Sequence, residues 1–185
     1  MTQRIVSLAI GYLCGMVLFA HFAGRLTHKD LSQEGSGNLG MANTIRVLGR
    51  KWGAMVLAGD ILKVIVAVAV CQLLYHEAIL TLYAGLGAAL GHCYPAWHHF
   101  TGGKAVACLS AAYVLYAPLW GIVSLAVGGL AVLLKMGLKW GAVLISLTFA
   151  CAMGLTGSQE AFWLSLVMAA LMILRNAPRN KLDKK

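Results

Sequence analysis

Residues 35–50, called here the first glycine segment, carry the side chains best suited to binding an anion in an otherwise mostly apolar chain. Their glycines let the backbone turn tightly and approach a ligand closely. Hydroxyl, amide and guanidinium groups come from Ser36, Asn38, Asn43 and Arg46, and such groups suit an anionic ligand. We interpret the segment as a binding loop for phosphate.

Gly35, Gly37 and Gly40 match the spacing of the dinucleotide-binding fingerprint, but their surroundings differ from it. That fingerprint has meaning only between a strand and the crossover helix of a βαβ unit. Here both flanks are long apolar stretches, which predict helices. We therefore expect no dinucleotide site.

Residues 91–104, the second glycine segment, end in Gly102-Gly103-Lys104. A Walker phosphate loop needs a glycine five residues before Gly103 and a Ser or Thr after the lysine, and both are missing. A lysine behind two glycines, at the expected start of a helix, still suits phosphate.

Metal and disulfide chemistry are not predicted. The histidines of the second glycine segment, His92, His98 and His99, do not have the spacing of metal ligands. The five cysteines show no C-x-x-C spacing, and four fall in or beside apolar stretches. We interpret the cysteines as small residues of membrane helices, and we expect neither a cofactor nor a metal.

Asp60 and Lys63 are ionisable residues inside an apolar stretch. Such residues cost about 2.5–3.5 kcal/mol each on insertion scales, which makes them functional candidates. Three positions apart on a helix, they face the same side. Two interpretations stay open: the pair neutralises itself, or both side chains point into the same cavity as the first glycine segment.

The composition indicates an integral membrane protein. The chain is 60% hydrophobic and 11% charged, with a mean hydropathy of +0.78, whereas soluble domains have about 25% charged residues. About 20 helical residues span the hydrocarbon core. We predict an all-α fold with seven transmembrane helices in one membrane-embedded domain, residues 1–185. The predicted spans are approximately 5–24, 52–75, 78–91, 104–118, 119–134, 140–156 and 159–174.

The positive charges predict the orientation in the membrane. With seven spans, the first loop, the loops after the third and fifth spans and the C-terminal tail lie on one side, and they carry Lys and Arg. The opposite turns, near residues 76–77, 118 and 158–160, carry none. We place the N-terminus outside and the C-terminus in the cytoplasm. The formal net charge of +9 is then mostly a property of the inner face, and no nucleic-acid partner is expected.

Both glycine segments resemble signatures of the bacterial acyl-phosphate:glycerol-3-phosphate acyltransferases (PlsY). Gly35-Ser36-Gly37-Asn38-Leu39-Gly40, with Asn43, Arg46 and Gly49, is similar to the first signature. Asp60-Ile61-Leu62-Lys63 resembles a stretch of the second helix, and Gly91-His92-Cys93-Tyr94-Pro95, with Phe100 and Gly102-Gly103-Lys104, resembles the second signature. The third signature departs: Asn176 follows Arg175 where the family has His, and Asn180 fits only with a shift of one place.

The resemblance implies an enzyme of the bacterial inner membrane with its active site facing the cytoplasm. It would transfer a fatty acyl group from acyl-phosphate to the 1-hydroxyl of glycerol 3-phosphate, giving lysophosphatidic acid. We expect Ser36, Asn38 and His92 to be catalytic. The expected substrate-binding residues are Gly35, Gly37, Gly40, Asn43, Arg46, Asp60, Lys63, Gly102, Gly103, Lys104, Arg175, Asn176 and Asn180.

In the family the phosphate of the substrate is thought to accept the proton, so no acyl-enzyme is expected. We expect a monomer or a weak oligomer in the lipid bilayer. Two alternatives stay open. A small channel or carrier would use the same basic loops for phosphate-bearing solutes, although the chain shows no internal repeat. A non-catalytic membrane homologue would fit the altered third signature.

Overall fold

The computed structural model describes residues 1–176, and every regular element in this range is a helix. The predicted all-helical class is therefore confirmed for the described residues. The elements are α1 (Thr2–Gly15), α2 (Phe19–Leu26), α3 (Met41–Leu48), α4 (Arg50–Tyr75), α5 (Leu80–Cys93), η1 (Ala96–His98), α6 (Val106–Tyr116), α7 (Pro118–Leu133), α8 (Leu138–Leu155) and α9 (Gln159–Asn176).

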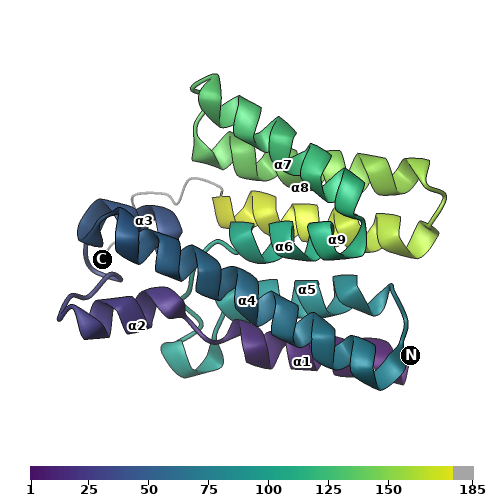
Figure 1. Ribbon diagram of the computed structural model, residues 1–185, viewed down its shortest axis with the longest axis horizontal. Coiled ribbons are helices and arrows are strands. Elements are labelled where there is room, and N and C mark those ends of the chain that lie inside the picture. Colours follow the sequence, from purple (N-terminus) through teal and green to yellow (C-terminus); the bar gives the residue numbers. More distant parts are fainter. Residues whose placement is uncertain (177–185) are drawn as a thin grey trace. The chain divides into compact units, whose positions relative to one another are not determined.

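The chain forms two compact units, residues 1–122 and 123–185. The first contains α1 to α6 and the start of α7, with α4 in contact with α1, α2, α3, α5 and α6 (Figure 1). In the second unit α8 and α9 pack against each other. The single domain expected from the sequence stays a prediction.

Within residues 1–176, three stretches are long and apolar enough to cross a membrane: Thr2–Leu26, Arg50–Tyr75 and Leu138–Leu155. The first stretch contains both α1 and α2. The predicted span 5–24 is therefore not one continuous helix, since it is interrupted at residues 16–18. The second corresponds to the predicted span 52–75, and the third to 140–156. Apolar helices α6 and α7 are shorter. The count of seven spans stays a prediction.

Small residues bring α1 and α5 into close contact. A Cβ added at Gly11 or Gly15 would collide with the α5 backbone at Ala84 or Ala88, and one at Gly87 would collide with the α1 backbone. Close approach through Gly and Ala is a common way for membrane helices to associate. Gly87 and Gly91 of α5 therefore serve close packing against α1. This contact fixes the end of α5 that carries His92.

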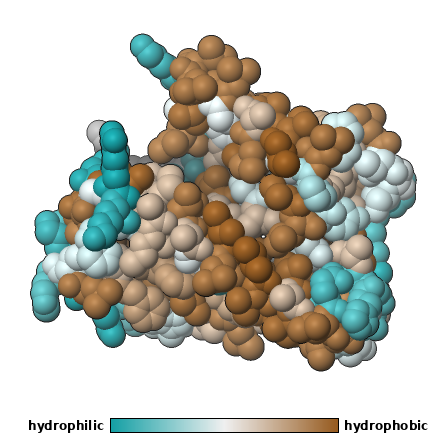
Figure 2. Space-filling view, in the orientation of Figure 1, coloured by the Kyte–Doolittle hydropathy of each residue, from teal (hydrophilic) through white to brown (hydrophobic). Residues whose placement is uncertain are grey.

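The first glycine segment is not a continuous loop, because it contains α3. Gly40 precedes the helix in an extended conformation, and the Thr44 hydroxyl donates to the Gly40 carbonyl at 3.0 Å. Contacts with α4 hold both α2 and α3. In Figure 2, hydrophilic residues gather at the end of the first unit where α2 and α3 lie, and the surface over α4 is mostly hydrophobic. The glycine segment thus lies at the polar end of an apolar helix.

Candidate active site

Asn43 holds the loop before α3 in shape. This residue is buried, with 2% of its surface exposed. Its Oδ1 accepts a hydrogen bond from the Ser36 N–H at 2.7 Å, and its Nδ2 donates to the carbonyls of Leu31 and Glu34, each at 3.0 Å. One side chain therefore fixes backbone groups along the whole loop. Ser36 itself is exposed, so the fixed loop presents it to its surroundings.

Two glycines give this loop backbone torsions that other residues rarely adopt. Gly35 has a φ of 64° and Gly37 a φ of 68°. A Cβ at Gly35 would also collide with the Oδ1 of Asn43. These glycines are therefore required by the turn and by the Asn43 contact, in addition to any approach of a phosphate.

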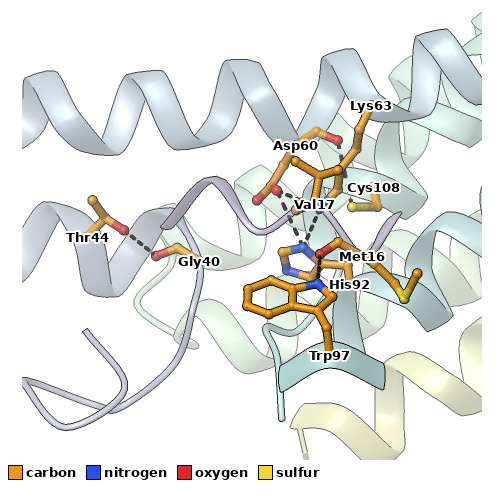
Figure 3. A network of polar contacts seen from close by, with 9 residues as sticks. All are labelled: Met16, Val17, Gly40, Thr44, Asp60, Lys63, His92, Trp97 and Cys108. Carbon is orange, nitrogen blue, oxygen red and sulfur yellow. Dashed lines mark hydrogen bonds and ion pairs between the residues drawn. The ribbon is translucent and has the colours of Figure 1, made fainter. Parts of the chain in front are cut away.

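Asp60 and Lys63 of α4 meet His92 of α5 in a buried polar cluster (Figure 3). Their exposed fractions are 3%, 5% and 3%. The Lys63 Nζ lies 2.9 Å from the Asp60 Oδ1 and 2.7 Å from the His92 Nδ1. The same Asp60 oxygen is 3.4 Å from that imidazole nitrogen. The three side chains therefore share one set of contacts.

The ammonium group of Lys63 has a third acceptor, the carbonyl of Val17 at 3.0 Å. Val17 lies in the break between α1 and α2. The ammonium thus has hydrogen-bond contacts with the Val17 carbonyl and the His92 ring and an ion pair with Asp60, all inside the protein. Of the two interpretations of the Asp60–Lys63 pair, the structure favours mutual neutralisation, because a substrate phosphate would have to displace one of these partners.

Gly102 and Gly103 fold the second glycine segment around His92. The Gly103 N–H donates to the His92 carbonyl at 3.0 Å, and a Cβ at Gly102 would collide with that carbonyl. A Cβ at Gly103 would collide with the His92 Nε2 and lie 2.7 Å from the Leu39 carbonyl. Leu39 belongs to the first glycine segment, so the two segments meet at Gly103.

Potential metal-ligand atoms of Asp60, His92 and Cys108 lie within 4.8 Å of one another in the part of the chain that the structure describes. The Lys63 ammonium, however, already takes the place of a cation beside Asp60 and His92. The Cys108 thiol donates to the backbone carbonyl of Asp60, with 3.7 Å between sulfur and oxygen. The cluster is better described as an internally balanced group than as a metal centre.

Two further cations predicted to bind substrate lie in the first unit. Arg46 is exposed in the last turn of α3, and Lys104 is half-buried just before α6 begins. Asn38 is half-buried in the loop before α3, and Gly40 is buried at the start of that helix. Their roles in substrate binding stay predictions.

Two residues of the altered third signature, Arg175 and Asn176, belong to the second unit. Arg175 and Asn176 end α9, and the Asn176 amide donates to the Met172 carbonyl one turn earlier at 2.9 Å. Asn180 lies outside the described residues. A substrate-binding role for these three stays a prediction.

Sequence reasoning did not predict that the backbone at residues 16–18 would accept hydrogen bonds from the buried cluster and from the second glycine segment. The Val17 carbonyl accepts from Lys63, and the Met16 carbonyl accepts from the Trp97 indole at 2.8 Å (Figure 3). Every residue has a backbone carbonyl, so the sequence does not show which carbonyls accept such hydrogen bonds. The only available hint was that long polar side chains this deep among apolar helices must find acceptors.

These features define a class: a helical integral membrane protein in which two glycine-rich segments meet beside a buried polar cluster. A sequence model of the family described as glycerol-3-phosphate acyltransferase matches residues 5–181. The chain belongs to the glycerol-3-phosphate acyltransferase family. The predicted family is thereby confirmed, and the protein is an acyltransferase of membranes.

Relatives and solved structures agree with this assignment. Glycerol-3-phosphate acyltransferase 1 of Lactobacillus johnsonii is 36% identical over 94% of this chain and 85% of its own length. The Bacillus subtilis enzyme is 44% identical over 64% of this chain and 61% of its own. Crystal structures of PlsY, an integral membrane glycerol 3-phosphate acyltransferase, are 27% identical. The glycerol 3-phosphate form has a TM-score of 0.84 over 93% of this chain and 87% of that one, and the lysophosphatidic acid form has 0.82 over 94% and 88%.

Proposed function

We propose that this protein transfers a fatty acyl group from an acyl-phosphate to the 1-hydroxyl of glycerol 3-phosphate, forming lysophosphatidic acid for phospholipid synthesis. The PlsY structures in glycerol 3-phosphate and lysophosphatidic acid forms support this acceptor and product. One observation carries the proposal: Asn43 fixes the loop backbone while Ser36 stays exposed. A fixed polar loop of this kind suits the orientation of a small phosphorylated alcohol.

The reaction exchanges one oxygen for another at the acyl carbon. The 1-hydroxyl oxygen attacks the carbonyl carbon, and the bond from that carbon to the phosphate oxygen breaks. The departing phosphate takes the hydroxyl proton, so the step balances without a cofactor or a metal. Both substrates carry phosphate, and the protein's task is to bind two anions and orient the reacting atoms. The acyl chain lies among apolar helices.

Ser36 and Asn38 are assigned to orienting the attacking hydroxyl and the acyl carbonyl. Arg46 and Lys104 are assigned to the phosphates, where each charge-assisted hydrogen bond contributes roughly 1.5–3 kcal/mol. Backbone N–H groups of the glycine segments add further donors. Through these contacts the first unit provides both orientation and charge.

His92 is assigned a positioning role within catalysis. Its Nδ1 contacts Lys63 at 2.7 Å, its carbonyl accepts from Gly103, and only 3% of it is exposed. A residue with these contacts is poorly placed to take a proton from substrate. It instead holds the two glycine segments together, and Asp60 and Lys63 hold its ring.

In the same proposal, the chain crosses the bacterial inner membrane seven times as a monomer or a weak oligomer. The N-terminus is outside, and the glycine segments and the C-terminus face the cytoplasm. The distribution of Lys and Arg among the loops supports this orientation. Single cysteines placed at Ser36 or Thr101 should react with a membrane-impermeant reagent only after the inner face is opened. One at Gln159 should react in intact cells, and labelling of Ser36 there would contradict the topology.

An assay with purified protein tests the reaction. Acyl-phosphate and glycerol 3-phosphate, in detergent and without ATP, should give lysophosphatidic acid detectable by mass spectrometry. A chelator should leave the rate unchanged, since no step uses a metal. Uptake of glycerol 3-phosphate by sealed proteoliposomes, with no acyl product from any donor, would instead support a carrier.

A further inference from the structure

A cleft of about 420 Å³ lies in the first unit, lined by α2, the loop that follows α2, Leu39 of the first glycine segment and His98 of η1. Its polar lining comes from His21, Arg25, His28, Lys29, Asp30 and His98. None of the residues predicted for acyl transfer lines it. The proposed reaction therefore leaves this concentration of imidazole and basic groups without a role.

His21 places an unsatisfied polar atom beside this cleft. Its Nε2 is buried and has no hydrogen-bond partner within residues 1–176. Edge-to-face contacts fix the ring, with centroid distances of 5.1 Å to Trp97 and 5.3 Å to His98. Trp97 is itself held by its hydrogen bond to the Met16 carbonyl. Buried polar groups normally have a partner, so a ligand that supplies one is favoured here.

The charges lining the cleft favour an anion. Arg25 is exposed and has no ion-pair partner in the described part of the chain. Lys29 pairs with Glu34 at 3.2 Å, with both side chains more than 40% exposed. Asp30 accepts from the hydroxyl and the N–H of Ser32, at 2.6 and 2.9 Å, and these hydrogen bonds lower the pKa of its carboxyl. Arg25 therefore remains as the cation available to a ligand.

The surroundings of the cleft identify the source of that anion. Phe22, Leu26, Trp97 and Phe100 are 47%, 68%, 48% and 61% exposed, and they lie on the same elements as the lining residues or next to them. The cleft is also at the end of an apolar stretch long enough to cross a membrane. Exposed aromatic residues at that level are typical of the membrane–water interface, where lipid phosphates lie.

We propose that this cleft binds the phosphate of an anionic phospholipid from the surrounding bilayer. The His21 Nε2 and the Arg25 guanidinium donate to phosphate oxygens, and the acyl chains lie against the exposed apolar side chains of α2 and η1. The cleft adjoins the first glycine segment at Leu39 but is lined by no residue assigned to acyl transfer, and lipid binding there can be measured without turnover.

Native mass spectrometry of the detergent-solubilised full chain tests the proposal, with phosphatidylglycerol as the probe. This lipid is neither substrate nor product of the proposed reaction. The wild type should bind it more tightly than phosphatidylcholine with the same acyl chains. Arg25→Gln and His21→Phe should each weaken binding about tenfold or more, the effect of losing one charge-assisted hydrogen bond. Arg50→Gln, at an exposed arginine that begins α4, is the matched control and should retain it.

Several results would overturn the site. Equal weakening by Arg25→Gln and Arg50→Gln would mean general attraction to a basic surface. Equal affinity for phosphatidylcholine would remove the role of charge, and displacement of the lipid by inorganic phosphate would assign the cleft to a soluble ligand. Binding of Zn²⁺ that is lost in His21→Phe would make it a metal site. If His21→Phe fails to fold by circular dichroism, Arg25→Gln decides alone, because Arg25 is exposed.

Discussion

The loop around Asn43 and the buried Asp60–Lys63–His92 cluster use polar residues in opposite ways. In the loop, one buried amide makes hydrogen bonds to the backbone, and Ser36, which we propose to be catalytic, stays exposed. In the cluster, the charged side chains contact one another, and less than a tenth of each is exposed. The first arrangement leaves a group accessible to the proposed substrate. The second fixes the helices that carry the groups.

This difference shows that residue type alone does not decide which polar side chains are available to contact a substrate. Lys63 and Lys104 are both cations predicted to bind phosphate, yet Lys63 already has two hydrogen-bond contacts and an ion pair within the protein. A buried charge must be paired to be tolerated, so its partners are fixed before any substrate arrives. The comparison predicts that changes in the cluster act on stability, whereas changes of the side chains assigned to substrate, Ser36, Arg46 and Lys104, act on kinetics.

Lys63→Met should have the largest effect, because it leaves the Asp60 carboxylate buried without its ammonium partner. Breaking a buried ion pair by removing one partner costs about 3–5 kcal/mol. Thermal unfolding in detergent, followed by circular dichroism, should show a clearly lower Tm. Lys51→Met, at an exposed position in the first turn of the same helix, is the control and should unfold like the wild type.

The double variant Asp60→Asn/Lys63→Met sharpens this prediction. It removes both charges, so most of the lost stability should return. A double variant as unstable as Lys63→Met would show that packing of the lysine stem, and not charge pairing, holds the cluster.

Ser36→Ala should lower kcat by about 10²-fold, as misplacement of reacting groups does, with little change in KM or Tm. The backbone N–H that binds Asn43 is kept. Ser32→Ala is the matched control, because its hydroxyl donates to Asp30 in the same loop. A near-normal kcat would place the catalytic centre elsewhere, and an acyl-serine trapped on Ser36 in the wild type would show that it is a nucleophile.

Gly103→Ala should reduce stability by about 1–3 kcal/mol, the usual cost of overpacking. The added Cβ collides with the His92 imidazole, so the two glycine segments should separate and kcat should fall with the Tm. Gly129→Ala is the control, since a Cβ there has no neighbour within 4 Å. Unchanged Tm and kcat in Gly103→Ala would mean that this contact does not hold the segments together.

Arg46→Ala should have the smallest effect of the set. It removes one exposed cation assigned to phosphate, so KM for a phosphate substrate should rise about tenfold, with a smaller change in kcat. Initial rates against glycerol 3-phosphate and against acyl-phosphate identify which phosphate it binds. Arg50→Ala should leave both KM values unchanged. An equal rise in KM in that variant would show that Arg46 acts only through general electrostatic attraction.

Much of the fold could be predicted because hydrophobic length is a strong signal. The predicted span 52–75 corresponds to α4. The break at residues 16–18 could not be predicted, since no proline marks it. Helix α3 was likewise hidden by the surrounding polar and glycine residues.

The candidate site was only partly predictable. Residue types located Ser36, Asn43, Lys63 and His92, but they did not show which polar groups would pair internally. Gly103 illustrates the reason: its place directly before Lys104 suits phosphate binding, whereas the space that its Cβ would fill is occupied by the His92 ring. Such contacts join residues that are distant in sequence, and a pattern of residue types does not predict them.

The most direct test compares the two lysines in one measurement, KM for glycerol 3-phosphate and for acyl-phosphate at a temperature where every variant is folded. Lys104→Met should raise KM for at least one of these substrates about tenfold or more, because a phosphate loses its cation. The Asp60→Asn/Lys63→Met variant should keep both KM values near those of the wild type. An equal rise in KM in the double variant would contradict the account, because it would place the buried cluster in direct contact with substrate.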